Sequence, residues 1–311
     1  MRKFFLLPVV LLLVGMFAGC ASFKQDVYDF MINAERSRSD LKPGSVDIGE
    51  QNIAYMERAG VGETIVLIHG FGADKDNWVR FVRHIPRQYR VVCFDMPGHG
   101  DNSKLDDKTY DIDYITNGFA QAADALGLSR FHIAGNSMGG YISMLYTSRN
   151  PDSVITMCLL DTAGLTAETP QPSHLQLALA RGQSPLTPTS EEEYEELLKY
   201  AFHKKPFFPW PITSVLAGRA VQSSDFTQKM WKEFHTSPVD IAPMLPGIDL
   251  PSLVIWGDKD RILHVSTTEV LERLLSDCET IIMKDGVVCA RSERPEETAG
   301  YYVSFLNKYK K

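Results

Sequence analysis

A serine flanked by glycines, in Gly135-Asn-Ser-Met-Gly139, is the stretch of this chain whose residue types and spacing most clearly suggest covalent chemistry. A largely apolar run ends at Gly135 and a helical pattern starts at Met138. The serine is therefore expected on a tight turn from a strand into a helix. Glycine tolerates the crowding of such a turn because it has no Cβ. A hydroxyl held above a sheet in this way can attack a carbonyl carbon, so we predict that Ser137 is a nucleophile.

Short apolar runs and helical patterns alternate on both sides of this turn. Runs such as Thr64–Ile68 are continuously apolar, as expected of strands buried on both faces. This alternation favours a parallel sheet in an α/β fold. The expected strands are the one that ends at the serine turn and residues 45–48, 52–58, 64–68, 90–95, 154–160, 252–256 and 279–283. The expected helices are residues 77–85, 113–126, 138–149, 266–275 and 295–309.

The alternation stops between residues 163 and 247. Prolines cluster there, and helical patterns cover residues 173–180 and 191–202. A loop without secondary structure would be too long here for a compact domain. We therefore predict a helical cap, residues 163–247, inserted into one α/β core made of residues 45–162 and 248–311.

The N-terminus has the features of an export segment, residues 1–20. Arg2 and Lys3 precede an apolar run that meets Cys20, as in a signal peptide. Phe17-Ala-Gly-Cys20 is similar to a bacterial lipobox, which predicts lipidation of Cys20 and, with Ala21 next, the outer membrane. The alternative is an uncleaved signal anchor in the inner membrane. In both cases the membrane is a partner through the N-terminus, residues 21–44 form a polar tether, and the body lies in the periplasm.

Composition and charge exclude several other classes of protein. The 311 residues are 44% hydrophobic and carry a net charge of −7, so no basic face for nucleic acid is expected. Cys93 and Cys158 lie inside apolar runs, where a thiol packs as a small hydrophobic side chain. The histidines show no spacing typical of metal ligands. We expect no metal and no cofactor, and no pattern indicates an oligomeric state.

Four short motifs fall in a recognisable order along the chain. They are Leu67-Ile-His-Gly-Phe-Gly72, Asp95-Met-Pro-Gly-His-Gly100, Gly135-Asn-Ser-Met-Gly-Gly140 and Trp256-Gly-Asp-Lys-Asp260. In these motifs the chain resembles the α/β-hydrolase superfamily, and within it the exported, membrane-attached bacterial lipases and phospholipases. The resemblance covers about residues 45–308. It implies an α/β-hydrolase fold, a mostly parallel eight-stranded sheet flanked by helices with an inserted helical cap, and ester hydrolysis.

The same resemblance implies roles for individual residues. The oxyanion of the reaction would be held by the backbone N–H groups of Phe71 and Met138. The acid that orients the catalytic base would be Asp260, with Asp161 and then Asp258 as alternatives. His69 belongs to a His-Gly-x-Gly segment, which acts through its backbone, so we expect a structural histidine there.

The histidine of the family is missing from its expected place. The stretch Glu293-Arg-Pro-Glu-Glu297 matches the family pattern without a gap, and the histidine position then falls on Val288. Residues 286–292 are either a misread or damaged stretch of the gene, which we favour, or a true loss that leaves a non-catalytic relative. A substitute base, His264, is the third alternative, but its place at a helix start makes the required geometry unfavourable.

The functional prediction is a serine hydrolase that cleaves carboxylic esters through an acyl-enzyme on Ser137. Membrane attachment favours a lipid ester as substrate. The aromatic stretch Phe207-Phe-Pro-Trp210, after two lysines, either contacts lipid or fills the interface between cap and core. The alternatives are a non-catalytic lipoprotein that binds through the cap, and a carbon–carbon bond hydrolase of ring-cleavage products, which also carries Gly-Asn-Ser-Met-Gly-Gly.

Overall fold

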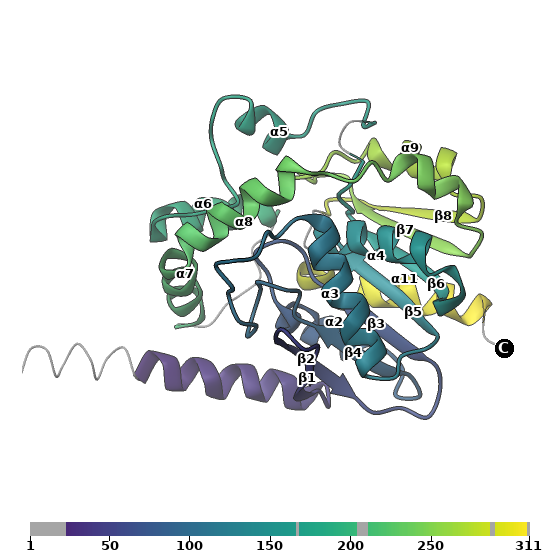
Figure 1. Ribbon diagram of the computed structural model, residues 1–311, viewed down its shortest axis with the longest axis horizontal. Coiled ribbons are helices and arrows are strands. Elements are labelled where there is room, and N and C mark those ends of the chain that lie inside the picture. The colour runs from purple at the N-terminus through teal and green to yellow at the C-terminus, as the bar shows by residue number, and fades with distance from the viewer. Residues whose placement is uncertain (1–22, 166–167, 204–210, 287–289, 310–311) are drawn as a thin grey trace, which may run out of the picture.

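The computed structural model describes residues 23–165, 168–203, 211–286 and 290–309 (Figure 1). The predicted export segment, Val288 and the aromatic stretch at Phe207 lie outside these residues. In the described part, eight strands form one sheet in the order β1-β2-β4-β3-β5-β6-β7-β8. The strands are β1 (Lys42–Asp47), β2 (Asn52–Arg58), β3 (Thr64–Ile68), β4 (Arg90–Phe94), β5 (Phe131–Asn136), β6 (Val154–Leu160), β7 (Ser252–Gly257) and β8 (Cys278–Met283).

Only the β1 side of the sheet is antiparallel. β1 pairs with β2 and β2 with β4 in antiparallel fashion, and every other pairing is parallel. This confirms the predicted mostly parallel, eight-stranded sheet. The parallel register sets Ile68 beside Gly135, Gly135 beside Leu159, and Leu159 beside Val254. The carboxyl ends of β3, β5, β6 and β7 therefore meet at one edge, where ligands bind in open α/β sheets.

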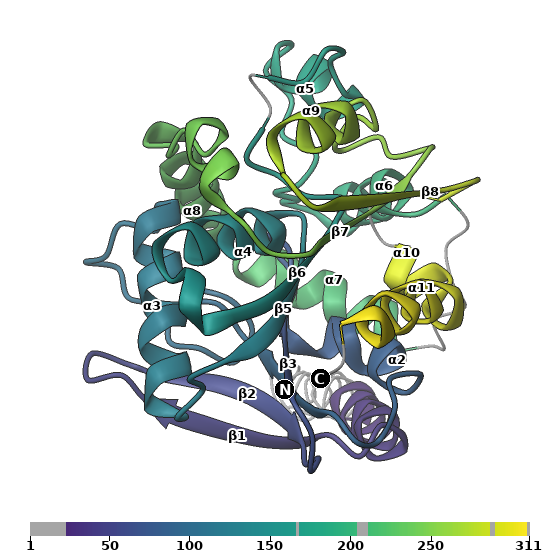
Figure 2. The ribbon, with the colours of Figure 1, turned by 90° about the vertical axis from the view of Figure 1, so that its right-hand side faces the viewer.

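Helices cover both faces of the sheet (Figure 2). On one face, α3 (Ile112–Ala125), α4 (Met138–Arg149) and α9 (Thr267–Leu274) contribute to a large apolar cluster. On the other face, α2 (Val79–Val82) and α11 (Pro295–Lys308), preceded by α10 (Ala290–Glu293), contribute to a smaller one. The strands between them are buried on both faces, which is why their sequences read as continuous apolar runs.

One predicted helix differs from the structure. Instead of a helix over 77–85, the chain forms the 3-10 turn η1 (Lys75–Trp78) followed by the single turn α2. The side chain of Asp74 accepts a hydrogen bond from the N–H of Asp76 at 2.9 Å, which starts the turn two residues early. Pro86 follows soon after and cannot continue a helix.

The chain between β6 and β7 is largely helical. It contains α5 (His174–Leu179), α6 (Glu191–Ala201), α7 (Ile212–Gln222), α8 (Ser224–Thr236) and the 3-10 segment η3 (Ala242–Gly247). Ser173 and Ser190 cap α5 and α6 by accepting main-chain hydrogen bonds. α8 is joined to the core because Glu233 accepts a hydrogen bond from the N–H of Tyr110 at 2.9 Å. We call this segment the β6–β7 insertion.

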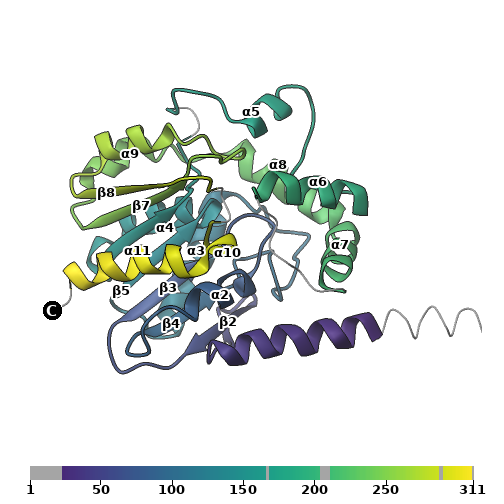
Figure 3. The ribbon, with the colours of Figure 1, turned by 180° about the vertical axis from the view of Figure 1, so that it is seen from behind.

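A helix over residues 23–38 packs along the outside of the core. In Figure 3 it runs from the region of β2 and α2 towards α7. Near its end, Nε and Nη2 of Arg36 both donate to the carboxylate of Asp76 at 2.6 Å. Near its start, the guanidinium of Arg219 in α7 lies 4.4 Å from the ring centre of Tyr28. The helix therefore contacts both the core and the β6–β7 insertion.

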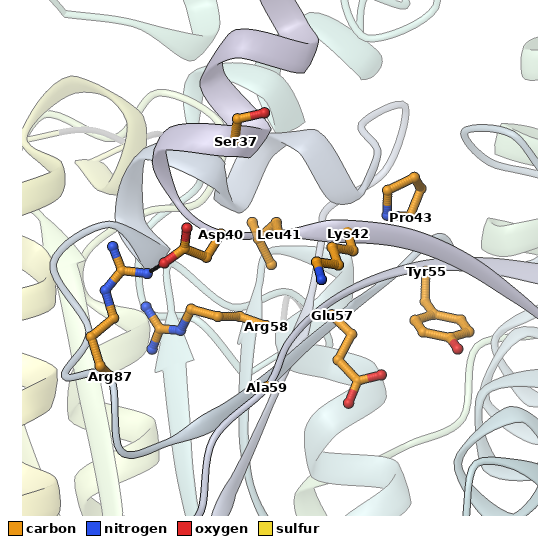
Figure 4. Close-up of a pocket in the computed structure, with 10 residues that line it drawn as sticks. All are labelled: Ser37, Asp40, Leu41, Lys42, Pro43, Tyr55, Glu57, Arg58, Ala59 and Arg87. Atoms are coloured by element: carbon orange, nitrogen blue, oxygen red, sulfur yellow. Dashed lines mark ion pairs between the residues drawn. The ribbon is translucent and has the colours of Figure 1, made fainter.

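A groove of about 820 Å³ lies where this helix ends (Figure 4). Its buried cation is Arg58, whose guanidinium donates to three main-chain oxygens around the end of α2, those of Val82, Ile85 and Pro86, at 2.9, 3.1 and 3.0 Å. Arg87 forms an ion pair with Asp40 across the groove. Arg58 thus fixes the main chain that follows α2, and Arg87 joins that loop to the end of the helix of residues 23–38.

Among the described residues, no helix combines the length and the apolar character that crossing a membrane requires. This statement does not cover the predicted export segment, residues 1–20, which lies outside the described residues.

Candidate active site

Ser137 occupies a strained turn between β5 and α4. Its backbone angles are φ 54° and ψ −117°, in a region that residues with a side chain seldom adopt. Main-chain hydrogen bonds to both the N–H and the carbonyl of Ser137 hold this turn. The N–H of Ser137 donates to the carbonyls of Leu160 and Asp161 at 3.0 and 3.1 Å, and its carbonyl accepts from Gly140 and Ala163 at 2.9 and 3.0 Å. The carbonyl also accepts from the N–H of Tyr141 at 3.2 Å, so five main-chain hydrogen bonds sustain the strain.

The glycines of the turn are required by close backbone approach. A Cβ on Gly139 would lie 2.2 Å from the carbonyl oxygen of Ile68. A Cβ on Gly135 would lie 2.1 Å from the carbonyl oxygen of Gly139. Neither contact is possible for another residue without a backbone shift. This explains in atomic terms why the serine is flanked by glycines.

The two predicted oxyanion donors lie on either side of this turn. Gly70, the neighbour of Phe71, is so close that a Cβ there would lie 3.2 Å from Cβ of Ser137. Met138 is the first residue of α4, where main-chain N–H groups have no partner within the helix. Within the part of the chain that the structure describes, neither the N–H of Phe71 nor that of Met138 donates a hydrogen bond. Phe71 and Met138 thus stay the predicted oxyanion donors.

Asp260 is buried after β7 and has one carboxylate oxygen unused. Its Oδ1 accepts hydrogen bonds from the N–H groups of Ile262 and Leu263 at 2.7 and 3.0 Å. Its Oδ2 is buried without a hydrogen-bond partner among the described residues. Burial raises the pKa of Asp260 to about 7, against the effect of those two hydrogen bonds. A carboxylate held at one oxygen and free at the other is suited to orient an imidazole.

The two alternative acids have other environments. Asp161 is buried at the end of β6 and its Oδ1 accepts from the N–H of Gly257 at 2.8 Å, which joins β6 to β7. Burial, and then the nearby charge of Asp260, raise the pKa of Asp161 well above its usual range. Asp258 lies within ion-pair distance of Lys259, at 3.5 Å. The structure thus brings Asp161 and Asp260 together at one edge, and only Asp260 combines burial with two main-chain donors on one oxygen.

Two described histidines near this edge, His69 and His264, are engaged in other contacts. Nε2 of His69 accepts from the N–H of Met96 at 3.0 Å, so its Nδ1 carries the proton and donates to the carbonyl of Gly70 at 2.7 Å. Burial lowers the pKa of His69 to about 3. Nδ1 of His264 contacts the hydroxyl of Ser266 at 2.8 Å and accepts from its N–H at 3.2 Å. Nε2 then bears the ring hydrogen, and the lone pair on Nδ1 of His264 is already occupied by the N–H of Ser266.

The comparison with protein families decides where the chain belongs. A model of the α/β hydrolase fold matches residues 63–286. The chain belongs to the α/β-hydrolase family. It is 31% identical over 285 residues to Lipase 3 of Moraxella sp. strain TA144, covering 90% of each chain. It is 30% identical over 279 residues to Lipase 1 of Psychrobacter immobilis, covering 88% of this chain and 87% of that one.

Among solved structures, the chain is similar to a membrane phospholipase A described as a bacterial virulence factor. That crystal structure superposes with a TM-score of 0.92 and 38% identity, covering 99% of each chain. With the lipases above, it shows that this α/β-hydrolase is a carboxylic ester hydrolase by ancestry.

One charged residue at the site escaped sequence analysis. Arg291 of α10 is buried, lies 5.0 Å from the ring centre of Trp78, and its Nη2 donates to Oδ1 of Asn77 at 3.4 Å. Burial is the main cause of the raised pKa of Asp161 and the lowered pKa of His69; the positive charge of Arg291 opposes the first shift and adds to the second. The sequence around Arg291 is polar, which predicts an exposed side chain, so no sequence signal indicated that it is buried. Its burial places a cation on the segment that follows Val288.

Among the described residues, no three histidine, cysteine or acidic side chains come together as a metal ion would require.

Proposed function

We propose that this site cleaves the carboxylic ester of a lipid through an acyl-enzyme on Ser137. The observation that carries the proposal is the strained serine at the start of α4, beside Gly70, with the N–H groups of Phe71 and Met138 donating to no described residue. The hydroxyl would attack the ester carbonyl carbon, and the two N–H groups would hold the oxygen that becomes negative. One such donor typically contributes about 2.7–4 kcal/mol to the transition state. Departure of the alcohol leaves an ester on Ser137, which water then cleaves.

The proposed reaction needs a proton acceptor that Val288 cannot supply. A base takes the proton of Ser137 and returns it to the leaving alcohol, and Asp260 would orient that base through its free Oδ2. The turn, the donors and this buried carboxylate are all present. We therefore propose that residues 286–292 are a misread or damaged stretch of a hydrolase gene. The rival account is a non-catalytic protein that binds lipid through the insertion.

The lipid nature of the substrate rests on the relatives and on the N-terminus. Two relatives are named lipases and a similar structure is named a membrane phospholipase A. In our proposal residues 1–20 are an export signal, residues 21–44 connect it to the core through the packed helix of residues 23–38, and residues 163–247 are a cap over Ser137. The body would then lie in the periplasm, attached either through a lipidated Cys20 to the outer membrane or through a signal anchor to the inner membrane.

A fluorophosphonate probe, which labels activated serines, tests this proposal. We expect no labelling of the chain as sequenced, labelling of Val288→His, and none of the double variant Ser137→Ala/Val288→His. The labelled variant should hydrolyse a short acyl ester and leave a vinylogous diketone intact, which separates ester hydrolysis from carbon–carbon cleavage. Labelling of Ser137 in the chain as sequenced would show that another group is the base. A correctly folded Val288→His variant that stays unlabelled would leave only the non-catalytic account.

A further inference from the structure

The side chain of Phe71 lies among aromatic rings that come from two separate parts of the molecule. His99, in the loop after β4, lies edge-on to it at 5.6 Å between ring centres. Trp231 and Phe234, both in α8 of the β6–β7 insertion, lie at 4.9 and 6.3 Å. These separations are typical of favourable aromatic pairs. The residue that carries a predicted oxyanion donor is thus packed between the core and the insertion.

The main chain around Phe71 forms a tight turn with few side chains to hold it. The carbonyl of Gly70 accepts hydrogen bonds from the N–H of Ala73 at 3.2 Å and from Nδ1 of His69 at 2.7 Å. Because the peptide bond is planar, these bonds also orient the N–H of Phe71 within the turn. Gly72 has a φ of 69°, and a Cβ placed on it would meet no described atom within 4 Å. The ring of Phe71 is therefore the largest side chain that can fix the position of this turn.

The neighbours of the Phe71 ring are themselves held in place. Nδ1 of His99 donates to the carbonyl of Pro97 at 3.0 Å, because a carbonyl can only accept. On the other side, Nζ of Lys229 in α8 donates to the carbonyl of Lys108 at 2.7 Å, which joins the helix to the segment before α3. The ring thus lies between two fixed surfaces.

Trp231 also reaches the part of the site that carries the acid. It packs against a small apolar cluster formed by Leu175 and Ile262. The N–H of Ile262 donates to Oδ1 of Asp260 at 2.7 Å. One side chain of the insertion therefore contacts both the turn of Phe71 and the cluster beside Asp260.

We propose that Trp231 is a positioning residue for the oxyanion donor of Phe71. Its packing against the ring would keep the N–H of Phe71 where negative charge develops on the substrate oxygen. Trp231 acts through Phe71 rather than through the substrate. The inference rests on the proposed ester hydrolysis and adds the residue of the insertion that this reaction requires. Because an oxyanion donor acts mainly in the transition state, loss of Trp231 lowers turnover and leaves substrate binding nearly unchanged.

The kinetic test uses a short soluble ester and variants made in the Val288→His chain. Trp231→Ala should lower kcat by about ten- to a hundredfold and change KM by less than about twofold, since a misplacement of about 1 Å can cost about a hundredfold. Trp231→Phe keeps a ring against Phe71 and should keep kcat within about threefold. The matched control is Phe226→Ala, which removes another half-buried aromatic side chain of α8, one that packs on Tyr110, and should leave kcat unchanged.

A second measurement follows the N–H of Phe71 in the chain as sequenced, where no reaction is needed. In protein labelled with ¹⁵N-phenylalanine, the signal of Phe71 is the one that Phe71→Leu removes. We expect Trp231→Ala to lower its NMR order parameter from about 0.85, typical of rigid backbone, to below about 0.6. Trp231→Phe and Phe226→Ala should leave it unchanged.

Three results would overturn the positioning role of Trp231. They are an unchanged order parameter of Phe71 in Trp231→Ala, an unchanged kcat in Trp231→Ala, and an equal fall of kcat in Phe226→Ala. A mobile N–H of Phe71 in Trp231→Ala, found while Val288→His hydrolyses no ester, would support the positioning role and reject ester hydrolysis. The two proposals therefore fail separately.

Discussion

At the scale of single residues, the site combines a strained nucleophile with a carboxylate that is expensive to bury. Asp260 satisfies one oxygen with two N–H groups and leaves the other without a partner among the described residues. A buried and half-satisfied carboxylate costs stability, and natural proteins keep such groups where function needs them. In our account Oδ2 of Asp260 would accept a hydrogen bond from the histidine that Val288 replaces.

Replacing this carboxylate should therefore stabilise the chain at neutral pH. The pKa of Asp260 in the folded state, about 7, lies above its ordinary value of 3.8. The unfolded state therefore loses its proton first as pH rises, and folding stability falls between about pH 4 and pH 7. We expect Asp260→Asn to raise the free energy of unfolding by about 1–3 kcal/mol at pH 8 and to have little effect at pH 3.5.

Urea denaturation of both proteins at the two pH values measures this difference. Asp107→Asn, at an exposed position, is the control and should be neutral at both pH values. A loss of stability at pH 8 in Asp260→Asn would mean that the charged carboxylate is satisfied in the folded chain.

At the scale of elements, the helix of residues 23–38 is part of the folded body. The bidentate pair between Arg36 and Asp76 joins it to η1, directly after the loop that carries Phe71. The side chains of this pair are only 17% and 11% exposed, so water screens it weakly. The nearby pair of Arg38 and Glu35 leaves Arg38 64% exposed and should contribute little.

These two arginines make a matched pair of variants. We expect Arg36→Ala to lower the free energy of unfolding by about 1–2 kcal/mol, because it leaves the carboxylate of Asp76 mostly buried without its cation. Arg38→Ala should change it by less than about 0.5 kcal/mol. Chemical denaturation measures both. Equal small effects would show that the helix is only loosely attached.

At this scale sequence patterns predicted some elements well and others poorly. The helix 138–149 and the strand 154–160 were predicted at the bounds the structure has, because a sharp glycine turn and a long apolar run mark them. In the insertion, α7 and α8 were not predicted individually, although the chain between Pro211 and Pro238 holds no proline. Their packing is set by distant partners, such as the ring contact of Trp231 with Phe71 at 4.9 Å between centroids.

At the scale of the whole molecule, the parallel register is what assembles the site. The motifs at His69, Ser137 and Asp260 are far apart in sequence, yet β3, β5, β6 and β7 end at one edge and bring them together. Motif order predicted this edge, because carboxyl ends of parallel strands meet. A polar cavity of about 670 Å³ lined in part by Gly72 was not predictable, since it forms only where the N-terminal helix, the core and the insertion meet.

Hydrolysis of a short soluble ester by the Val288→His variant tests the central claim most directly. If the site lacks only its base, the variant should exceed the chain as sequenced by at least about 10³-fold in initial rate, since base removal costs at least that much in serine triads. The gain should vanish in Ser137→Ala/Val288→His. A folded variant no faster than the chain as sequenced would contradict the account, because the serine, the two donors and Asp260 would then not form a catalytic site.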